Sequence, residues 1–173
     1  LIAAFFLNGL ANGIPATLFL YFVSSVLKAE AMRGPLLFLY FACGIAGVPL
    51  ALYLAKRLGK HRAWCWAMLV TCLAFAFAPL LGPGDVPYFA VISIVTGLAL
   101  GFDLSLPASI QADVIDIDTL QSGEQRSGLY FAAWSLSTKL SLALGVGVVF
   151  PILEYAGFNP NALNTGDPSA LFT

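Results

Sequence analysis

The chain has 173 residues, of which 60% are hydrophobic and 10% are charged, and its formal net charge is −1. Soluble domains carry about 25% charged residues, so this chain has too little polar surface to coat a water-soluble fold, whereas a membrane accepts an apolar exterior. The lack of a basic excess argues against nucleic acid as a partner. We therefore expect an all-α membrane protein.

Five apolar runs, each with at most one charged residue, are long enough to cross a bilayer, which takes about 20 residues. They predict transmembrane helices over approximately residues 1–27, 34–55, 63–82, 87–112 and 128–155. Glycine and proline clusters separate several of these runs, as expected for turns. Trp64, Trp66 and Tyr88 lie near predicted helix ends, where we expect them to act as interface anchors.

The basic residues predict the orientation of these helices. Short cytoplasmic loops carry an excess of lysine and arginine. The basic residues of the two loops on one side are Lys56, Arg57, Lys60, Arg62 and Arg126, and those on the other side are Lys28 and Arg33. The loop 56–62 is therefore expected in the cytoplasm.

Two charged residues lie deep inside predicted helices. Lys139 is about 16 Å into its helix and Asp103 about 15 Å from the cytoplasmic end of its own, at 1.5 Å per residue. A charge in the bilayer costs at least a few kcal/mol and is commonly functional. Their similar depths and opposite charges suggest an ion pair. The residues form either a substrate or coupling-ion site or a structural pair that fixes helix packing.

Other polar residues are candidates to line the same cavity. Trp134 and Thr138 share a helical face with Ser141 and Gly145, which predicts a polar, open stripe. Asn8 and Asn12 are one turn apart, and Pro15 after them can kink the helix. These asparagines either line a cavity or form interhelical hydrogen bonds.

The loop predicted between the fourth and fifth helices carries a cluster of charged residues, which are Asp113, Asp116, Asp118, Glu124 and Arg126. Acidic groups at a helix C-terminus oppose its dipole, so we expect Asp113 and Asp116 to pair with basic groups on the same side of the membrane. The candidate partners for a cytoplasmic gate of salt bridges are Lys56, Arg57, Lys60, Arg62 and Arg126. The alternative is a solvated loop.

The sequence offers no catalytic or metal-binding constellation. Its three cysteines lack metal-ligand spacing and His61 is the single histidine. We expect no enzymatic activity, no metal site and no tightly bound cofactor.

Several motifs together resemble the glycoside–pentoside–hexuronide:cation symporters, the melibiose-permease branch of the major facilitator superfamily. The motifs are Asn8 to Ala16, Ala112 to Asp118, Gly123 to Phe131, Lys139, and Gly157-Phe158-Asn159-Pro160-Asn161. The resemblance implies that the chain is a partial C-terminal six-helix bundle, helices seven to eleven of a 12-helix fold. The N-terminal half and the last helix are then further parts of the same chain, and the polar tail 161–173 is expected to lead to that last helix.

The resemblance also implies a function. Members of the family couple entry of Na⁺ or H⁺ to uptake of a sugar or glycoside by alternating access, and Lys139 matches the family's helix-eleven lysine near the sugar and cation sites. We expect an integral protein of the bacterial cytoplasmic (inner) membrane, with a small-molecule solute and the lipid bilayer as partners. The alternatives are a same-family transporter of a lipid-like solute and a non-transport polytopic sensor or scaffold.

Overall fold

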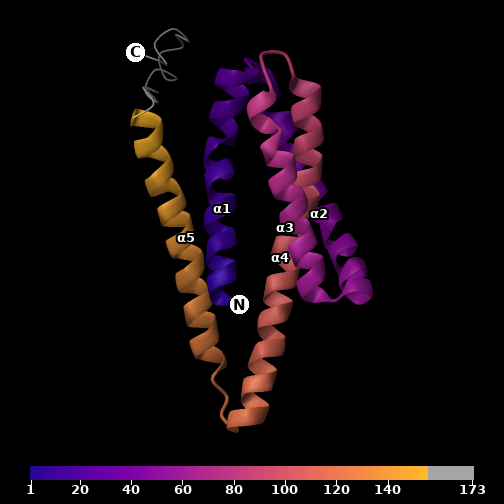
Figure 1. The fold of residues 1–173 in the computed structure, drawn as a ribbon, viewed down its shortest axis with the longest axis vertical. Helices are drawn as coiled ribbons and strands as arrows, with labels where there is room; N and C mark the ends of the chain where they lie inside the picture. The colour runs from indigo at the N-terminus through magenta and orange to yellow at the C-terminus, as the bar shows by residue number, and fades with distance from the viewer. Residues whose placement is uncertain (156–173) are drawn as a thin grey trace.

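The computed structural model describes residues 1–155, which form five long helices joined by short connections (Figure 1). The helices are α1 (Ile2–Tyr21), α2 (Arg33–Leu58), α3 (Lys60–Ala76), α4 (Val86–Ser122) and α5 (Ser127–Tyr155). A π-helix, η1 (Phe22–Val26), continues α1, and two 3-10 helices, η2 (Glu30–Met32) and η3 (Ala78–Leu80), lie in the connections. Within this range, five helical segments are long and apolar enough to cross a membrane. The Gly157–Asn161 motif and the tail 161–173 lie outside the described residues.

The basic loop between the second and third predicted helices is much tighter than expected. Gly59 alone separates α2 from α3, with φ of 87°, a conformation that glycine adopts without a steric penalty. Lys56 and Arg57 therefore lie in the last turn of α2, and Lys60 begins α3.

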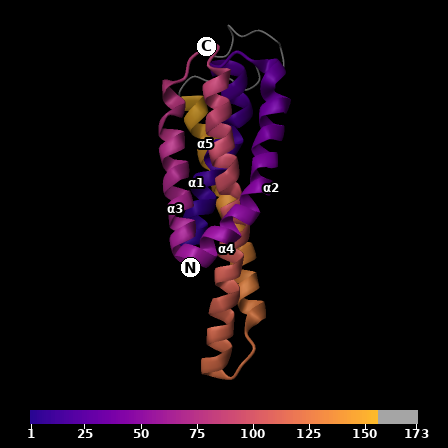
Figure 2. The same ribbon diagram turned by 90° about the vertical axis from the view of Figure 1, so that its right-hand side faces the viewer.

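The fourth helix is longer than the sequence predicted. Instead of ending at residue 112, α4 continues to Ser122 and ends at Gly123, which has the left-handed φ of 69° typical of a helix C-terminus. The α4–α5 hairpin consequently projects beyond the α2–α3 turn (Figures 1 and 2). Asp113, Asp116 and Asp118 lie on this helical extension, so their placement in a loop was wrong.

Helices α2 and α4 pack closely through glycines. A methyl group added at Gly97 would lie 2.5 Å from the Tyr40 carbonyl oxygen, and one added at Gly101 would lie 2.7 Å from the Gly44 carbonyl oxygen. Only small residues permit this approach of two helical backbones. The contacts advance along both helices together, so α2 and α4 run parallel.

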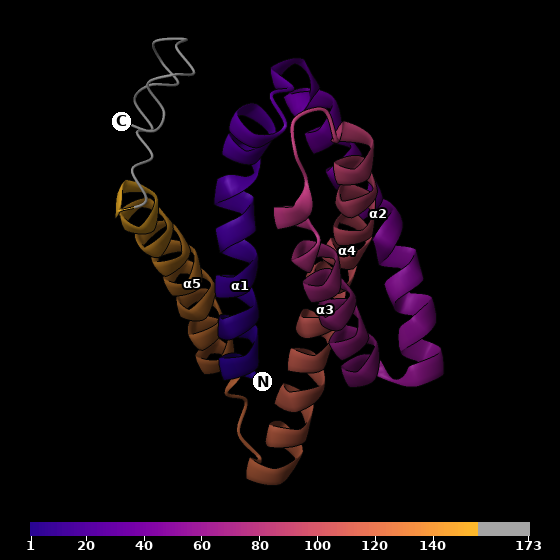
Figure 3. The ribbon, with the colours of Figure 1, turned by 45° about the horizontal axis from the view of Figure 1, so that its top comes forward.

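Helices α1 and α5 form a second parallel pair. Phe5 stacks on Trp134 with 3.7 Å between ring centroids, and further along, Gly13 faces Gly145. Helix α3 packs antiparallel on α4, and Figure 3 shows α1 and α5 beside the group formed by α2, α3 and α4.

Two apolar clusters hold these helices together. One includes Ala51, Trp64 and Leu106 from α2, α3 and α4, with Phe5 of α1 packed against it. The other joins η1 to the starts of α2 and α4 through Val23, Leu36 and Phe89. Many large apolar side chains elsewhere are exposed on the outer surface, as expected for a protein whose solvent is lipid.

Candidate functional site

Asp103 is the centre of a polar cluster that joins three helices. Its Oδ2 accepts a hydrogen bond of 2.8 Å from Asn12 Nδ2 of α1. Its Oδ1 accepts one of 2.7 Å from Trp64 Nε1 of α3. Asn8, one turn before Asn12, lines the same cavity as this carboxylate.

The helix geometry of α1 and α3 positions the donors to Asp103. The 3.6-residue period places Asn8 and Asn12 on one side of α1, and Trp64 is buried near the start of α3, 5% exposed. Hydrogen bonds to a charged group stabilise by about 1.5–3 kcal/mol. The cluster therefore fixes α1 against α3 and α4 at this depth.

A cavity of about 670 Å³ opens beside this cluster. Its polar lining comes from Asn8, Asn12, Thr71 and Asp103, and its other lining residues are apolar. The arrangement presents one carboxylate and two amides to a space with apolar walls. It can accept hydrogen-bond donors or a cation, but it offers no nucleophile–base pair for catalysis.

The expected Asp103–Lys139 ion pair is wrong. Both carboxylate oxygens of Asp103 accept hydrogen bonds from neutral donors. Lys139 is exposed on α5, and it is absent from the ion pairs formed among the described side chains. The α1–α5 contacts place Lys139 between the levels of Phe5 and Gly9, about one turn from the level of Asn12. The depths are thus similar, but the two side chains lie on different sides of the bundle.

The stripe predicted to be open is largely an interface. Trp134 stacks on Phe5, and Ser141 is buried against Gly9 of α1. Thr138 is exposed, and its hydroxyl donates to the Trp134 carbonyl oxygen at 3.0 Å. Thr138 and Lys139 therefore remain available on the exposed side of α5, whereas Trp134 and Ser141 hold α5 to α1.

Among the described residues, the predicted gate residues form one ion pair between helices. Lys60 Nζ lies 2.6 Å from Asp113 Oδ2, and this pair joins α3 to α4. Arg57 lies over the Tyr53 ring, 5.4 Å from its centroid. Lys56 and Asp116 are absent from the ion pairs among the described residues.

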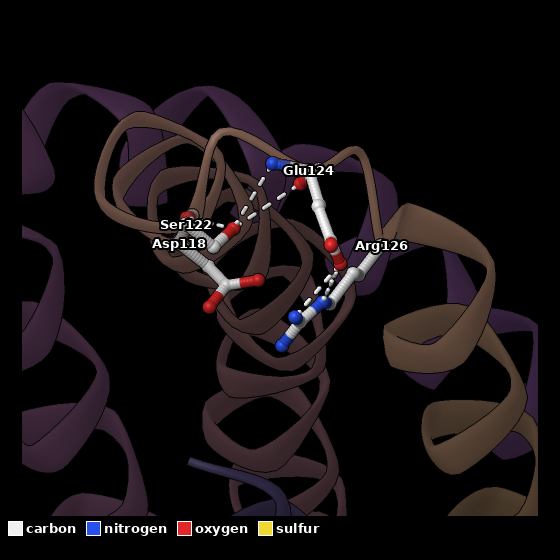
Figure 4. A network of polar contacts seen from close by, with 4 residues as sticks. All are labelled: Asp118, Ser122, Glu124 and Arg126. Atoms are coloured by element: carbon white, nitrogen blue, oxygen red, sulfur yellow. Dashed lines mark hydrogen bonds and ion pairs between the residues drawn. The ribbon is translucent and has the colours of Figure 1, made fainter.

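Arg126 pairs locally at the tip of the α4–α5 hairpin (Figure 4). Its guanidinium donates to Glu124 Oε2 at 2.8 and 2.9 Å, and the Ser122 hydroxyl donates to the Asp118 carbonyl oxygen at 2.7 Å. These contacts close the turn, and the expected pairing of Arg126 with Asp113 or Asp116 is not formed.

Trp64 is the contributor to the polar cluster that the sequence analysis did not identify. Trp64 was expected as an interface anchor, but it is buried and donates to Asp103. An indole N–H needs an acceptor when it is buried. That requirement, together with an isolated carboxylate in the next helix, was the signal available in the sequence.

The five membrane-length helices are those of an integral membrane protein, and comparison with known proteins shows its family. A protein family described as MFS/sugar transport protein matches residues 1–172. The chain belongs to this family, within the major facilitator superfamily. The family consists of transporters, which confirms the expected absence of enzymatic function.

Three curated relatives are similar to this chain. An uncharacterized symporter of Synechocystis is 30% identical over 91% of this chain and 29% of its own length. The mouse sphingosine-1-phosphate transporter MFSD2B is 24% identical over 94% of this chain and 33% of its own length. The uncharacterized symporter YjmB of Bacillus subtilis is 22% identical over 90% of this chain and 34% of its own length. The chain thus spans about a third of the length of these relatives. No solved structure matches it.

Proposed function

We propose that the protein containing this chain is a secondary transporter that couples entry of Na⁺ or H⁺ to uptake of a sugar, glycoside or related small solute. The five helices would be helices seven to eleven of twelve. The working protein would lie in a bacterial cytoplasmic membrane, as two relatives are bacterial proteins named as symporters.

The observation that carries this proposal is the position of Lys139. It lies near the middle of a 29-residue helix, exposed and without an acidic partner among the side chains that the structure describes. A solitary cation inside a membrane span is costly, so it needs a partner or a function. Its counter-charge would come from the rest of the protein, from the solute, or from a group that exchanges its own partner when the coupling ion binds.

The remaining polar residues have different parts in this proposal. Thr138 lies beside Lys139 on the exposed side of α5 and would contact the solute. Trp134 would set the orientation of that side by its stacking on Phe5. Asp103, Asn8 and Asn12 would fix the rotation of α1, and Asp113 with Lys60 would form the cytoplasmic closure.

Uptake of a panel of labelled sugars and glycosides into cells expressing the full-length protein tests the proposal. We expect accumulation of at least one sugar that increases with an inward Na⁺ gradient or is abolished by a protonophore. Cells expressing Lys139→Met provide the background. Gradient-independent equilibration of every sugar would contradict coupling, and no uptake of any solute would favour a sensor or scaffold.

A lipid-like solute is the second candidate, supported by the surroundings of Lys139. Leu136, Leu140 and Leu142 are 66%, 46% and 63% exposed on the same helix. A cation among exposed apolar side chains suits an amphipathic anion, with its headgroup on Lys139 and its tail along the leucines. MFSD2B, named as a transporter of sphingosine-1-phosphate, is one of the relatives. Including a labelled lysophospholipid in the uptake panel separates the two candidates.

A further inference from the structure

Helix α3 has an exposed side that takes no part in the Asp103 cluster. Its opposite side packs with α2 and α4 through Ala63, Trp64 and Ala67. The exposed side carries a shallow hollow of about 270 Å³, whose lining residues are His61, Arg62, Cys65, Trp66 and Leu69. The larger cavity beside Asp103 is lined by other residues of α3, so the two are separate features.

The basic residues at the start of α3 are not all balanced by acidic ones. A cation in the first turn of a helix is unfavourable beside the positive end of the helix dipole, so an anion nearby stabilises it. Lys60 has such an anion in Asp113. Arg62 and His61 are exposed and form no ion pair with the side chains that the structure describes. The hollow therefore carries a guanidinium that is free to bind an anion.

The lining residues follow one another along α3 in the order of the parts of a membrane phospholipid. Trp66 is about 6 Å and Leu69 about 10 Å further along the helix than Arg62, at 1.5 Å per residue. Arginine binds phosphate oxygens in a bidentate manner, indole rings prefer the headgroup level, and exposed leucines suit acyl chains. Cation, indole and aliphatic side chain thus match phosphate, glycerol region and acyl chain.

The position and size of the hollow favour a lipid over a soluble anion. It lies where α2 turns into α3, the end that the basic residues predict to be cytoplasmic, and basic residues next to a membrane span attract anionic lipids. Its volume of about 270 Å³ is below the range of about 300–1,000 Å³ typical of sites that enclose small molecules. The hollow therefore suits a headgroup whose acyl chains lie outside it, along the apolar side of α3.

We propose that this hollow binds an anionic phospholipid of the cytoplasmic leaflet, with the phosphate on Arg62 and His61 and the glycerol region against Trp66. Phosphatidylglycerol has the required chemistry, a single phosphodiester charge with acyl chains attached. The bound lipid would hold the start of α3, and with it the Lys60–Asp113 pair, at the membrane surface. The inference goes beyond the proposed function and holds for either solute and either coupling ion.

Alkylation of Cys65 in the full-length protein tests the site, because this thiol lines the hollow. The protein, with Cys65 as its single cysteine, is placed in nanodiscs of phosphatidylcholine with increasing phosphatidylglycerol and treated with the neutral reagent N-ethylmaleimide. We expect phosphatidylglycerol to slow the reaction. In an Arg62→Gln variant, about five times more phosphatidylglycerol should be needed for the same effect, as for loss of one cation at a membrane surface.

Two controls separate this site from a general effect of surface charge. Arg57→Gln removes the same charge five residues away, where Arg57 lies over the Tyr53 ring and outside the lining of the hollow, and it should leave the protection of Cys65 unchanged. A Leu58→Cys, Cys65→Ser variant reports an exposed position at the same turn, and phosphatidylglycerol should slow its reaction little.

Several results would overturn the proposal. Equal slowing at positions 58 and 65, or equal effects of Arg62→Gln and Arg57→Gln, would show a general charge effect. Protection of Cys65 in phosphatidylcholine alone would show that another part of the protein covers the hollow. Protection by inorganic phosphate in phosphatidylcholine discs would show a site for a soluble anion.

A second measurement uses the unmodified full-length protein, so it does not depend on how any variant folds. Phosphatidylglycerol with a photoactivatable headgroup is cross-linked to the protein in nanodiscs, and the adducts are mapped by mass spectrometry. We expect adducts on residues 61–69, suppressed by an excess of ordinary phosphatidylglycerol and not by phosphatidylcholine. Absence of adducts from residues 61–69, or equal suppression by both lipids, would contradict the site.

Discussion

Asp103 shows how a single carboxylate can organise a membrane bundle. Each of its oxygens accepts a hydrogen bond from a different helix, from Asn12 and from Trp64. Removing either donor leaves an acceptor buried without its partner, which costs about 1–3 kcal/mol or more for a charged group. Asn12, Trp64 and Asp103 therefore contribute to stability as a group, because the loss of one donor leaves the carboxylate incompletely paired.

Trp64→Phe is expected to lower the thermal midpoint of the full-length protein clearly, because it deletes one donor and keeps most of the ring. The loss corresponds to about 1–3 kcal/mol. Trp66→Phe is the matched control, since Trp66 is 58% exposed two residues away. Thermal unfolding of both variants in the same detergent makes the comparison. Equal midpoints would show that the Asp103 hydrogen bond contributes nothing to stability.

The sequence identified Asp103, Lys139 and Asn12 but gave a wrong partner. Counting residues along a helix gives depth, and the depths of Asp103 and Lys139 do agree within about one turn. Partners also depend on how each helix rotates about its axis. Here that rotation is set by contacts such as Phe5 with Trp134, which lie far apart in sequence.

At the scale of elements, glycine contacts decide how close α2 and α4 approach. Gly101 lies against Gly44, Gly47 and Val48 of α2, so an added methyl group would overlap backbone atoms that cannot move independently. A flexible side chain could rotate away from an added methyl group. Backbone atoms cannot, so α2 and α4 would have to move apart.

Gly101→Ala is therefore expected to destabilise the protein by about 1–3 kcal/mol or more, the usual cost of overpacking. Gly147→Ala is its control, because Gly147 has nothing within 4 Å of an added methyl group. Alanine favours helix by up to about 1 kcal/mol over glycine, so the control should be neutral or slightly stabilising. Folded yield and thermal midpoint measure both. Similar yields and midpoints for the two variants would refute the close approach.

The Lys60–Asp113 pair joins α3 and α4 at the end of the bundle where Lys56 and Arg57 also lie. Both side chains are partly exposed, 36% and 52%, so the pair should contribute only about 0–1 kcal/mol to stability. A role in closing the cytoplasmic side would appear in transport instead.

Asp113→Asn should therefore reduce net uptake while leaving the thermal midpoint nearly unchanged. The charge-swapped variant Lys60→Asp with Asp113→Lys should recover part of the uptake, because it restores an attractive pair. Asp118→Asn, on the same helical extension, serves as the control. Unchanged uptake by the Asp113→Asn variant would show that the Lys60–Asp113 pair is a surface contact with no role in transport.

Helix existence followed from the sequence, because long apolar runs have few alternatives in lipid. The end of α4 was predicted wrongly, because Asp113, Asp116 and Asp118 suggested a loop, whereas the helix continues to Ser122. Helical hydrogen bonding can continue into water beyond the membrane, and hydropathy does not detect that boundary. Gly123 was the more reliable sequence signal for the end of α4, because helices commonly end at a glycine in the left-handed conformation, as this one does.

For the whole molecule, the distribution of basic residues predicts a single orientation. The α2–α3 turn and the α4–α5 turn lie toward one end, and the α1–α2 and α3–α4 connections lie at the other (Figure 1). The end with the larger number of lysines and arginines should face the cytoplasm.

Cysteine labelling of the full-length protein checks this orientation. In a background without Cys43, Cys65 and Cys72, a Lys56→Cys variant should react with an impermeant thiol reagent only after the cells are opened. A Lys28→Cys variant should react in intact cells. The reverse pattern would invert the topology and move the Lys60–Asp113 pair to the outside.

The most direct measurement of the transport role of Lys139 is uptake by full-length Lys139→Met, with folding followed in parallel. Asp103 is satisfied by Asn12 and Trp64, so the change should not leave it without partners, and the thermal midpoint should be maintained. Uptake should fall by about tenfold or more, as when about 1.4 kcal/mol of interaction is lost. Lys28→Met, outside the membrane spans, should transport normally. Normal uptake by Lys139→Met would contradict the assignment of Lys139 to the transport site.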